Sequence, residues 1–219
     1  MNLFDIIGPV MIGPSSSHTA GAARIGRMAR RLLDDEPVKA DILLHGSFAK
    51  TYQGHGTDRA VIGGLLDMSV DDQNLRNALQ IAKEKGLDYT FTPTELKDAH
   101  PNTIRLHLWG KQGSEIIVQA ASIGGGEIRV ETINGLEAGF RGKQHTLVIF
   151  HTDVPGVIAE VSRVLGQKNL NIATMRVFRE SVGGRAVMAL EMDDEIYPHT
   201  LEALRGVHGV KRAISLEKV

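Results

Sequence analysis

Residues 13–21 of the sequence read Gly-Pro-Ser-Ser-Ser-His-Thr-Ala-Gly and place several polar side chains directly before an expected helix. Backbone N–H groups at a helix start lack an intrahelical partner and carry a partial positive charge, so they favour an anion. One hydroxyl is enough to cap a helix. The surplus hydroxyls can donate to a carboxylate, and the imidazole titrates near neutral pH. The polar residues of this first helix start are Ser15, Ser16, Ser17, His18 and Thr19.

A second expected helix start repeats the combination of a histidine and a hydroxyl. Residues 54–58 read Gly-His-Gly-Thr-Asp, so that His55 precedes Thr57 as the expected N-cap and Asp58 suits the positive first turn. A glycine turn is expected further along the chain, and its residues are Gly124, Gly125 and Gly126. If the three segments converge, they form a site for one small carboxylate. The alternative is that they are an ordinary cap, a structural histidine and an ordinary turn.

The elements that would position these residues follow from the apolar spacing. Apolar residues at helical intervals predict a helix over residues 20–33, and the remaining face carries arginines, which predicts a solvated face. Those arginines are Arg24, Arg27 and Arg31. A short apolar run at residues 40–48 predicts a strand.

The rest of the N-terminal part alternates helix and strand signals. A second short helix is expected from Thr57 to near Leu66, and a third begins after Asp71 or Asp72 and ends at Gly86. Its inward positions are Leu75, Ala78, Leu79 and Ala82. Strands are expected at residues 103–109, 114–123 and 127–133.

A glycine-rich stretch without hydrophobic periodicity divides the chain into two expected domains. Residues 1–134 form one expected domain, residues 135–145 a glycine-rich linker without periodicity, and residues 146–219 a second domain. In the second domain the expected order is βαββαβ, a sheet with helices on one face. We therefore predict an α+β fold class: a mixed α/β domain followed by the βαββαβ domain. The expected elements of the second domain are strand 146–151, helix 155–167, strands 171–179 and 184–192, helix 198–205 and strand 209–216.

The composition excludes several classes of partner. Lys and Arg number 25 and Asp and Glu number 26, so the net charge of −1 argues against a nucleic-acid or membrane-surface footprint. The chain has no cysteine, so it offers neither disulfides nor thiolate ligands, and no metal site is predicted in this chain. Prolines interrupt the first apolar run and no segment has membrane-spanning length, which predicts a soluble, cytoplasmic protein.

Residues 147–180 resemble the first half of an ACT domain, through the Asp-Val-Pro-Gly-Val turn at 153–157 and Asn-Leu-Asn-Ile at 169–172. The resemblance implies a small regulatory module that often binds an amino acid where two copies meet. In the serine-binding ACT domain of phosphoglycerate dehydrogenase, a His and an Asn of the first loop and an Asn after the helix hold the ligand. The implied effector residues are His151, Asp153, Pro155, Gly156 and Asn171.

One of these positions departs from the ACT pattern. Asp153 stands where an amide is expected, and its carboxylate can hold an α-ammonium group but repels an α-carboxylate. The alternative is that Asp153 caps the helix and Asn171 satisfies a turn.

Residues 13–30, 45–66 and 122–128, followed by an ACT domain, closely resemble the β chain of iron–sulfur L-serine dehydratases. The resemblance implies that the N-terminal part is similar to the allosteric-substrate-binding domain of some phosphoglycerate dehydrogenases. It also implies conversion of L-serine to pyruvate and ammonia, with a [4Fe–4S] cluster held by cysteines of an α chain.

The resemblance also implies roles for the polar residues. The first helix start would clamp the substrate carboxylate, with Thr57, Asp58 and the three glycines opposite, and His18 and His55 would orient the substrate or move a proton. We favour orientation. The implied partners are the α chain, L-serine and a second copy bound through the ACT domain, because an exposed sheet edge invites pairing. The alternatives are an amino-acid-sensing regulatory subunit without catalytic role and a plain assembly subunit.

Overall fold

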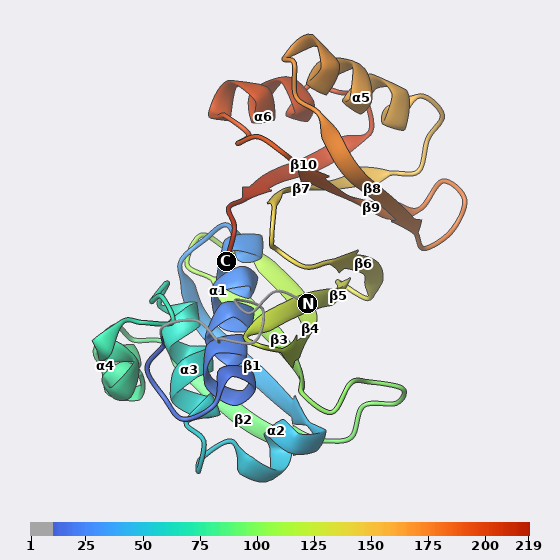
Figure 1. The fold of residues 1–219 in the computed structure, drawn as a ribbon. Helices are drawn as coiled ribbons and strands as arrows, with labels where there is room; N and C mark the ends of the chain where they lie inside the picture. Colours follow the sequence, from blue (N-terminus) through green and yellow to red (C-terminus); the bar gives the residue numbers. More distant parts are fainter. Residues whose placement is uncertain (1–10) are drawn as a thin grey trace. The chain divides into compact units, whose positions relative to one another are not determined.

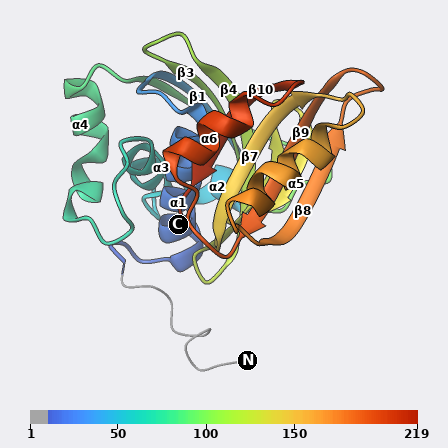
Figure 2. The same cartoon turned by 90° about the horizontal axis from the view of Figure 1, so that it is seen from above.

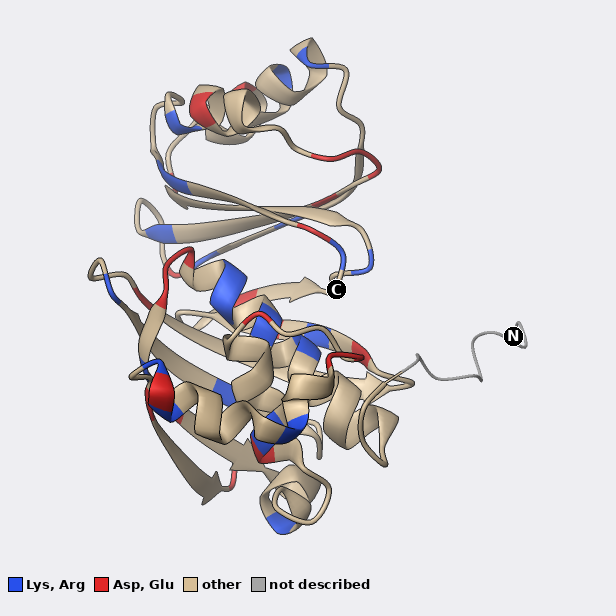
Figure 3. Cartoon of the chain, turned by 90° about the vertical axis from the view of Figure 1, so that its left-hand side faces the viewer, with Lys and Arg blue, Asp and Glu red and all other residues tan. Residues whose placement is uncertain are grey.

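The protein was analysed as a computed structural model that describes residues 11–219 (Figure 1). The chain divides into two compact units at the Asn134–Gly135 bond. Basic and acidic residues are distributed over both units (Figure 3). No helix among residues 11–219 is long and apolar enough to cross a membrane.

The first unit is a mixed sheet with helices on one face (Figure 1). Its strands follow the order β2-β1-β3-β4-β5, in which β1 and β2 are parallel and the other neighbours antiparallel. Strand β1 lies between β2 and β3, as the register shows, because Ile42 lies opposite Phe91 on one side and Leu106 on the other. The elements are η2 (Ser16–Ala20), α1 (Gly21–Leu33), β1 (Pro37–His45), α2 (Gly46–Thr51), α3 (Thr57–Leu65), η3 (Gln73–Asn77), α4 (Ala78–Glu84), β2 (Asp88–Thr94), β3 (Thr103–Gly110), β4 (Glu115–Gly124) and β5 (Glu127–Ile133).

Helix α1 is almost enclosed by the rest of the unit. Ile25, Met28 and Leu32 are fully buried on this helix, and alternate residues of β3 are buried on the facing side of the sheet. The expected helix at 20–33 is therefore correct, and its N-terminal extension is one π-helical turn, η2. Burial of each large apolar side chain contributes roughly 1.5–3 kcal/mol, so this packing fixes α1 against the sheet.

Helices α1 and α3 touch through their backbones. A Cβ atom at Gly26 would overlap the carbonyl oxygen of Val61, and one at Gly64 would overlap that of Ala23. Only glycine fits at these two positions without moving a helix. The contact brings the start of α3 beside the start of η2.

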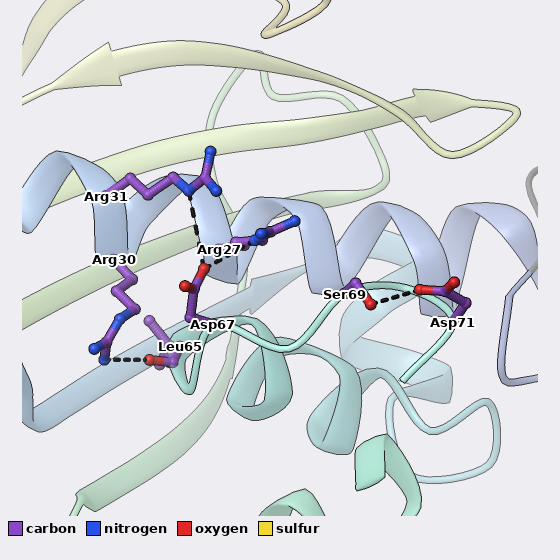
Figure 4. Close-up of polar contacts among 7 residues, drawn as sticks. All are labelled: Arg27, Arg30, Arg31, Leu65, Asp67, Ser69 and Asp71. Carbon is purple, nitrogen blue, oxygen red and sulfur yellow. Dashed lines mark hydrogen bonds and ion pairs between the residues drawn. The ribbon is translucent and has the colours of Figure 1, made fainter. Parts of the chain in front are cut away.

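The segment after α3 is tied to α1 by arginines (Figure 4). Arg27 Nε lies 2.9 Å from Asp67 Oδ1, and Arg31 Nε lies 3.9 Å from the same oxygen. Arg30 donates to the carbonyl oxygen of Leu65 at 3.0 Å. The expectation of a solvated arginine face is therefore wrong for Arg27 and Arg31, because both are partly buried against this segment.

Several boundaries differ from the sequence prediction because glycine and turn geometry intervene. The strand expected to reach residue 48 ends at His45, since Gly46 adopts φ 59° and begins α2. The N-cap of α3 is Gly56 at φ 69°, so Thr57 is the first helical residue rather than the cap. Asp72 caps the 3₁₀ turn η3, and α4 begins only at Ala78.

The second unit is a sheet of order β10-β7-β9-β8 with α5 and α6 on one face (Figure 2). The expected βαββαβ order is present in this unit, so the α+β fold class is confirmed. The segment 135–145, expected to be an aperiodic linker, instead contains strand β6. The elements are β6 (Leu136–Phe140), β7 (His145–Thr152), α5 (Val157–Gln167), β8 (Ile172–Arg179), β9 (Arg185–Met192), α6 (Pro198–Arg205) and β10 (Val210–Leu216).

We expect Gly26→Ala to lower the free energy of unfolding of the first unit by about 1–3 kcal/mol, because an added methyl group forces α1 and α3 apart. Trp109 is the single tryptophan and lies in β3, so its fluorescence in urea reports this unit. Gly54→Ala is the control, since the nearest heavy atom to its added Cβ is 3.8 Å away. Equal unfolding midpoints for the two variants would contradict the close contact of the helices.

Candidate active site

The first helix start has one serine as its cap. Ser15 adopts an extended conformation, and its Oγ accepts a hydrogen bond of 3.1 Å from the His18 N–H. Ser15 therefore fills the capping role that the sequence left open among several hydroxyls. Ser16 and Ser17 follow inside the first turn and are partly buried. Their hydroxyls are not required for capping and remain available for a ligand.

The His18 ring lies between two serine hydroxyls. Its Nδ1 is 3.3 Å from Ser15 Oγ, and its Nε2 is 2.9 Å from Ser47 Oγ at the start of α2. One ring nitrogen of a neutral imidazole donates and the other accepts, so both hydroxyls can be satisfied at once. The edge of the ring also packs on buried Phe48, with 5.2 Å between centroids. His18 is thus held in one orientation.

The two histidines of the predicted site meet. The ring centroids of His18 and His55 are 4.9 Å apart in an edge-to-face arrangement. Thr19 Oγ1 donates to the carbonyl oxygen of His55 at 3.1 Å and joins the two helix starts. Burial, and secondly the neighbouring His55, lower the pKa of His18 below its ordinary value. Both effects favour the neutral imidazole of His18, which can accept a proton or a hydrogen bond.

Asp58 lies at the second helix start but its carboxylate accepts a hydrogen bond from the backbone rather than from a histidine. Its Oδ1 accepts from the Arg59 N–H at 2.8 Å, and burial raises its pKa. Its charge acts on Tyr89, whose pKa is raised by burial and by Asp58. The hydrogen bonds among residues 11–219 include none from Asp58 to either histidine. Asp58 therefore does not orient an imidazole in this structure.

The glycine hairpin contacts α1 rather than the histidines. Gly124, Gly125 and Gly126 have φ values of 108°, 60° and 80°, as the expected turn requires. Arg24 Nη1 donates to the carbonyl oxygen of Gly126 at 2.7 Å, and burial lowers the pKa of this guanidinium. Arg24 therefore anchors the hairpin to α1 and is not a solvated residue.

Ser122, two residues before the glycines, lies closer to the first helix start. Its side chain is buried against Gly21, where a Cβ atom would overlap Ser122 Oγ. The hairpin thus reaches the helix start through Ser122, which sequence reasoning did not select.

Several buried polar atoms around this region have no hydrogen-bond partner among residues 11–219. In the first unit they are Thr57 Oγ1, Asn102 Oδ1, Thr103 Oγ1 and Ser122 Oγ. An unsatisfied buried polar atom costs about 1–3 kcal/mol, so such atoms indicate a missing polar partner.

The segment that carries Asn102 links two parts of the site. The Pro101 carbonyl accepts from the Ser47 N–H at 2.7 Å, and the Asn102 carbonyl accepts from the Ser122 N–H at 2.9 Å. The structure therefore adds Ser47, Asn102 and Ser122 to the candidate site. Ser47 and Ser122 lie inside the segments 45–66 and 122–128 that carry the family resemblance, so the sequence held a signal for both. Asn102 had none.

The described part of the chain lacks a set of side chains suited to a metal ion. No group of three or more His, Cys, Asp or Glu residues comes together within residues 11–219. The nine histidines of the sequence are therefore not assembled into a metal site within that range.

In the ACT domain, the implied effector residues already have protein partners. Asp153 Oδ2 accepts from Arg179 Nη1 at 2.8 Å, and this hydrogen bond lowers the pKa of Asp153. Asn171 donates to Asp193 at 2.9 Å. The N-cap of α5 is Gly156 at φ 91°, so Asp153 does not cap the helix.

A cavity of about 600 Å³ lies beside this ion pair. Pro155 and Gly156 line it together with Asp153 and Arg179. His151 is buried outside the lining, with Nδ1 2.9 Å from the Thr152 carbonyl oxygen and Nε2 without a partner among the described residues. The implied residues therefore do not all face one cavity.

Comparisons with known proteins assign both units to known families. Residues 2–132 match the family model of the serine dehydratase beta chain, and residues 145–209 match that of the ACT domain. The probable L-serine dehydratase beta chain of Bacillus subtilis is 46% identical over 93% of this chain and 92% of its own length. The L-serine dehydratase beta chain of Peptoniphilus asaccharolyticus is 37% identical over 93% and 92%.

A second group of relatives matches over part of its length. The D-3-phosphoglycerate dehydrogenase of Bacillus subtilis is 31% identical over 85% of this chain but only 35% of its own. The shared region therefore combines both units in two kinds of protein. With the beta-chain model matched over more than half of the sequence and two beta chains aligned almost end to end, this chain belongs to the serine dehydratase beta chain family.

Proposed function

We propose that this chain is the β subunit of an L-serine dehydratase and that its first unit clamps the carboxylate of L-serine. The observation that carries the proposal is the meeting of His18 and His55, with ring centroids 4.9 Å apart, at two helix starts rich in hydroxyls. The buried unpartnered hydroxyls of Thr57 and Ser122 support a polar ligand in this region. The names of the beta-chain relatives support L-serine as that ligand.

The reaction explains why a clamp is needed. L-serine loses its Cα proton and its β-hydroxyl as water, and the resulting enamine takes up water to give pyruvate and ammonia. Neither the Cα–H bond nor the β-hydroxyl group of serine is activated, so both must be held in one reactive geometry. A carboxylate fixed by Ser16, Ser17 and the N–H groups of the first turn would fix the rest of the small substrate.

His18 is suited to orienting the substrate. Its two ring nitrogens face Ser15 and Ser47, so the imidazole holds these hydroxyls in place. His55 is the more exposed of the two rings and has no hydrogen bond to its ring nitrogens among the described residues. We therefore propose that His18 orients the substrate and that His55 accepts the Cα proton.

We propose that the partner is an α chain that carries the iron–sulfur cluster. This chain has no cysteine and no group of potential metal ligands within residues 11–219, so its donor set does not fit a cluster. When bound in the partner, the cluster supplies a Lewis acid for the β-hydroxyl leaving group. The contribution of this chain is to bind and orient the substrate.

A second candidate function is amino-acid sensing by the ACT domain. The cavity beside Asp153 favours it, whereas the Asp153–Arg179 ion pair opposes it, because a ligand ammonium group would have to displace the guanidinium. The edge strands β8 and β10 supply backbone groups for association with a second copy. We therefore propose the ACT domain as an association module first and a sensor second.

Substitutions in the hydroxyl cluster, which comprises Ser15, Ser16 and Ser17, distinguish binding of the substrate carboxylate from capping of the helix. We expect Ser16→Ala or Ser17→Ala to lower kcat/KM for serine about ten- to a hundredfold at nearly unchanged melting temperature, because each removes a hydrogen bond to a charged group. Ser15→Ala should instead lower stability by about 1–2 kcal/mol as the cap is lost. Melting curves and serine kinetics with the α chain present give both quantities.

Ser162→Ala in α5 is the matched control and should change neither quantity. The clamp is refuted if every loss of rate disappears once the folded fraction of each variant is taken into account.

The isolated chain should be inactive. Purified alone under anaerobic conditions and supplied with iron and sulfide, it should develop no cluster absorbance near 400 nm and form no pyruvate from serine, because it has no thiolate ligand. Addition of the cysteine-bearing α chain should produce both signals. Turnover by this chain in the rigorous absence of the α chain would contradict the two-chain assignment.

A further inference from the structure

A cavity of about 280 Å³ opens beside the second helix start. Two guanidinium groups line it, those of Arg59 on α3 and Arg76 on η3, and no carboxylate of residues 11–219 does. Ser15, Ser16, Ser17 and His18 are absent from its lining, so the cavity is distinct from the hydroxyl cluster. It shares only Thr19 and His55 with the candidate active site.

The charge of this cavity is not neutralised within the described chain. Arg76 forms no hydrogen bond or ion pair with another residue among 11–219. Arg59 interacts electrostatically with its neighbour Asp58, but the Asp58 carboxylate is engaged by a backbone N–H and does not line the cavity. The two guanidinium groups face the same cavity, and no described carboxylate lines it. They therefore create a positive potential that attracts an anion.

Apart from the polar side chain of Gln53 and the shared Thr19 and His55, the remaining lining is apolar or small. Ile12, Pro14, Ala60 and Leu75 supply apolar surface, and Gly54 and Gly56 leave the backbone accessible because they lack side chains. A cavity of about 280 Å³ lies just below the usual range of small-molecule sites, which begins at about 300 Å³. The ligand that fits is therefore a molecule of few heavy atoms with one anionic end and one apolar end.

We propose that this cavity binds a small organic monocarboxylate, with Arg59 and Arg76 holding the carboxylate and the apolar lining covering its carbon atoms. Guanidinium groups match the planar geometry of a carboxylate and form charge-assisted hydrogen bonds with it. Thr19 and His55 line this cavity and also belong to the candidate active site, and the hydrogen bond from Thr19 to the His55 carbonyl oxygen joins them. The proposal goes beyond the clamp and does not depend on it.

Binding can be read on the full chain without any catalysis. We expect propionate, a monocarboxylate that is not a substrate, to shift the backbone amide signals of Gly54 and Gly56 saturably in NMR titrations of the ¹⁵N-labelled chain. Inorganic phosphate, which has no apolar part, should bind more weakly. The variant Arg59→Gln/Arg76→Gln should weaken propionate binding about tenfold or more, since it removes both charged donors.

The control removes the same charge elsewhere on the first unit. Lys111→Gln/Arg129→Gln alters two exposed residues outside the cavity and should bind propionate like the wild type. Absence of a saturable shift, equal binding by both double variants, or phosphate binding as tight as that of propionate would each overturn the proposal. Because the readout requires neither the α chain nor turnover, its failure would leave the proposed serine clamp intact.

Discussion

The backbone contact between α1 and α3 is the constraint on which the site depends. Gly26 and Gly64 let each helix approach a carbonyl oxygen of the other, a distance that no residue with a Cβ atom permits. This contact places the residues that precede the two helices next to each other, so that the rings of His18 and His55 meet. The salt bridge from Arg27 of α1 to Asp67, which follows the end of α3, also joins the two helices.

A rigid frame of this kind explains why polar atoms can remain unsatisfied around the site. Thr57 and Ser122 are fully buried, and their hydroxyls remain without a partner among residues 11–219. Unpaired polar atoms that are already held in place lower the stability of the fold. They require no further reorganisation when a substrate binds. The neutral state of His18 has the same origin, since burial is the main cause of its lowered pKa.

The sequence predicted the elements better than it predicted the contacts between them. Apolar periodicity identified α1, an expected helix start identified α3, and a run of glycines identified the hairpin, because these signals are local. Ser47 lies in a segment that carries the family resemblance, but its long-range hydrogen bond to His18 could not be read from that segment. Asn102 was missed because a buried polar atom without a partner has no local pattern. The cap at Thr57 was assigned wrongly because Gly56 adopts a left-handed conformation that propensity alone does not reveal. The strand in 135–145 was missed because its glycines hide its alternation.

The pKa of His18, followed by NMR in the wild type and in His55→Gln, tests the central claim most directly. If the helix contact places the two rings together in a partly buried site, the pKa of His18 lies below its ordinary value and rises when the His55 charge is removed. It should remain somewhat low in the variant, because burial is the larger cause. A pKa of ordinary value in the wild type, or one that does not respond to His55→Gln, would contradict the account.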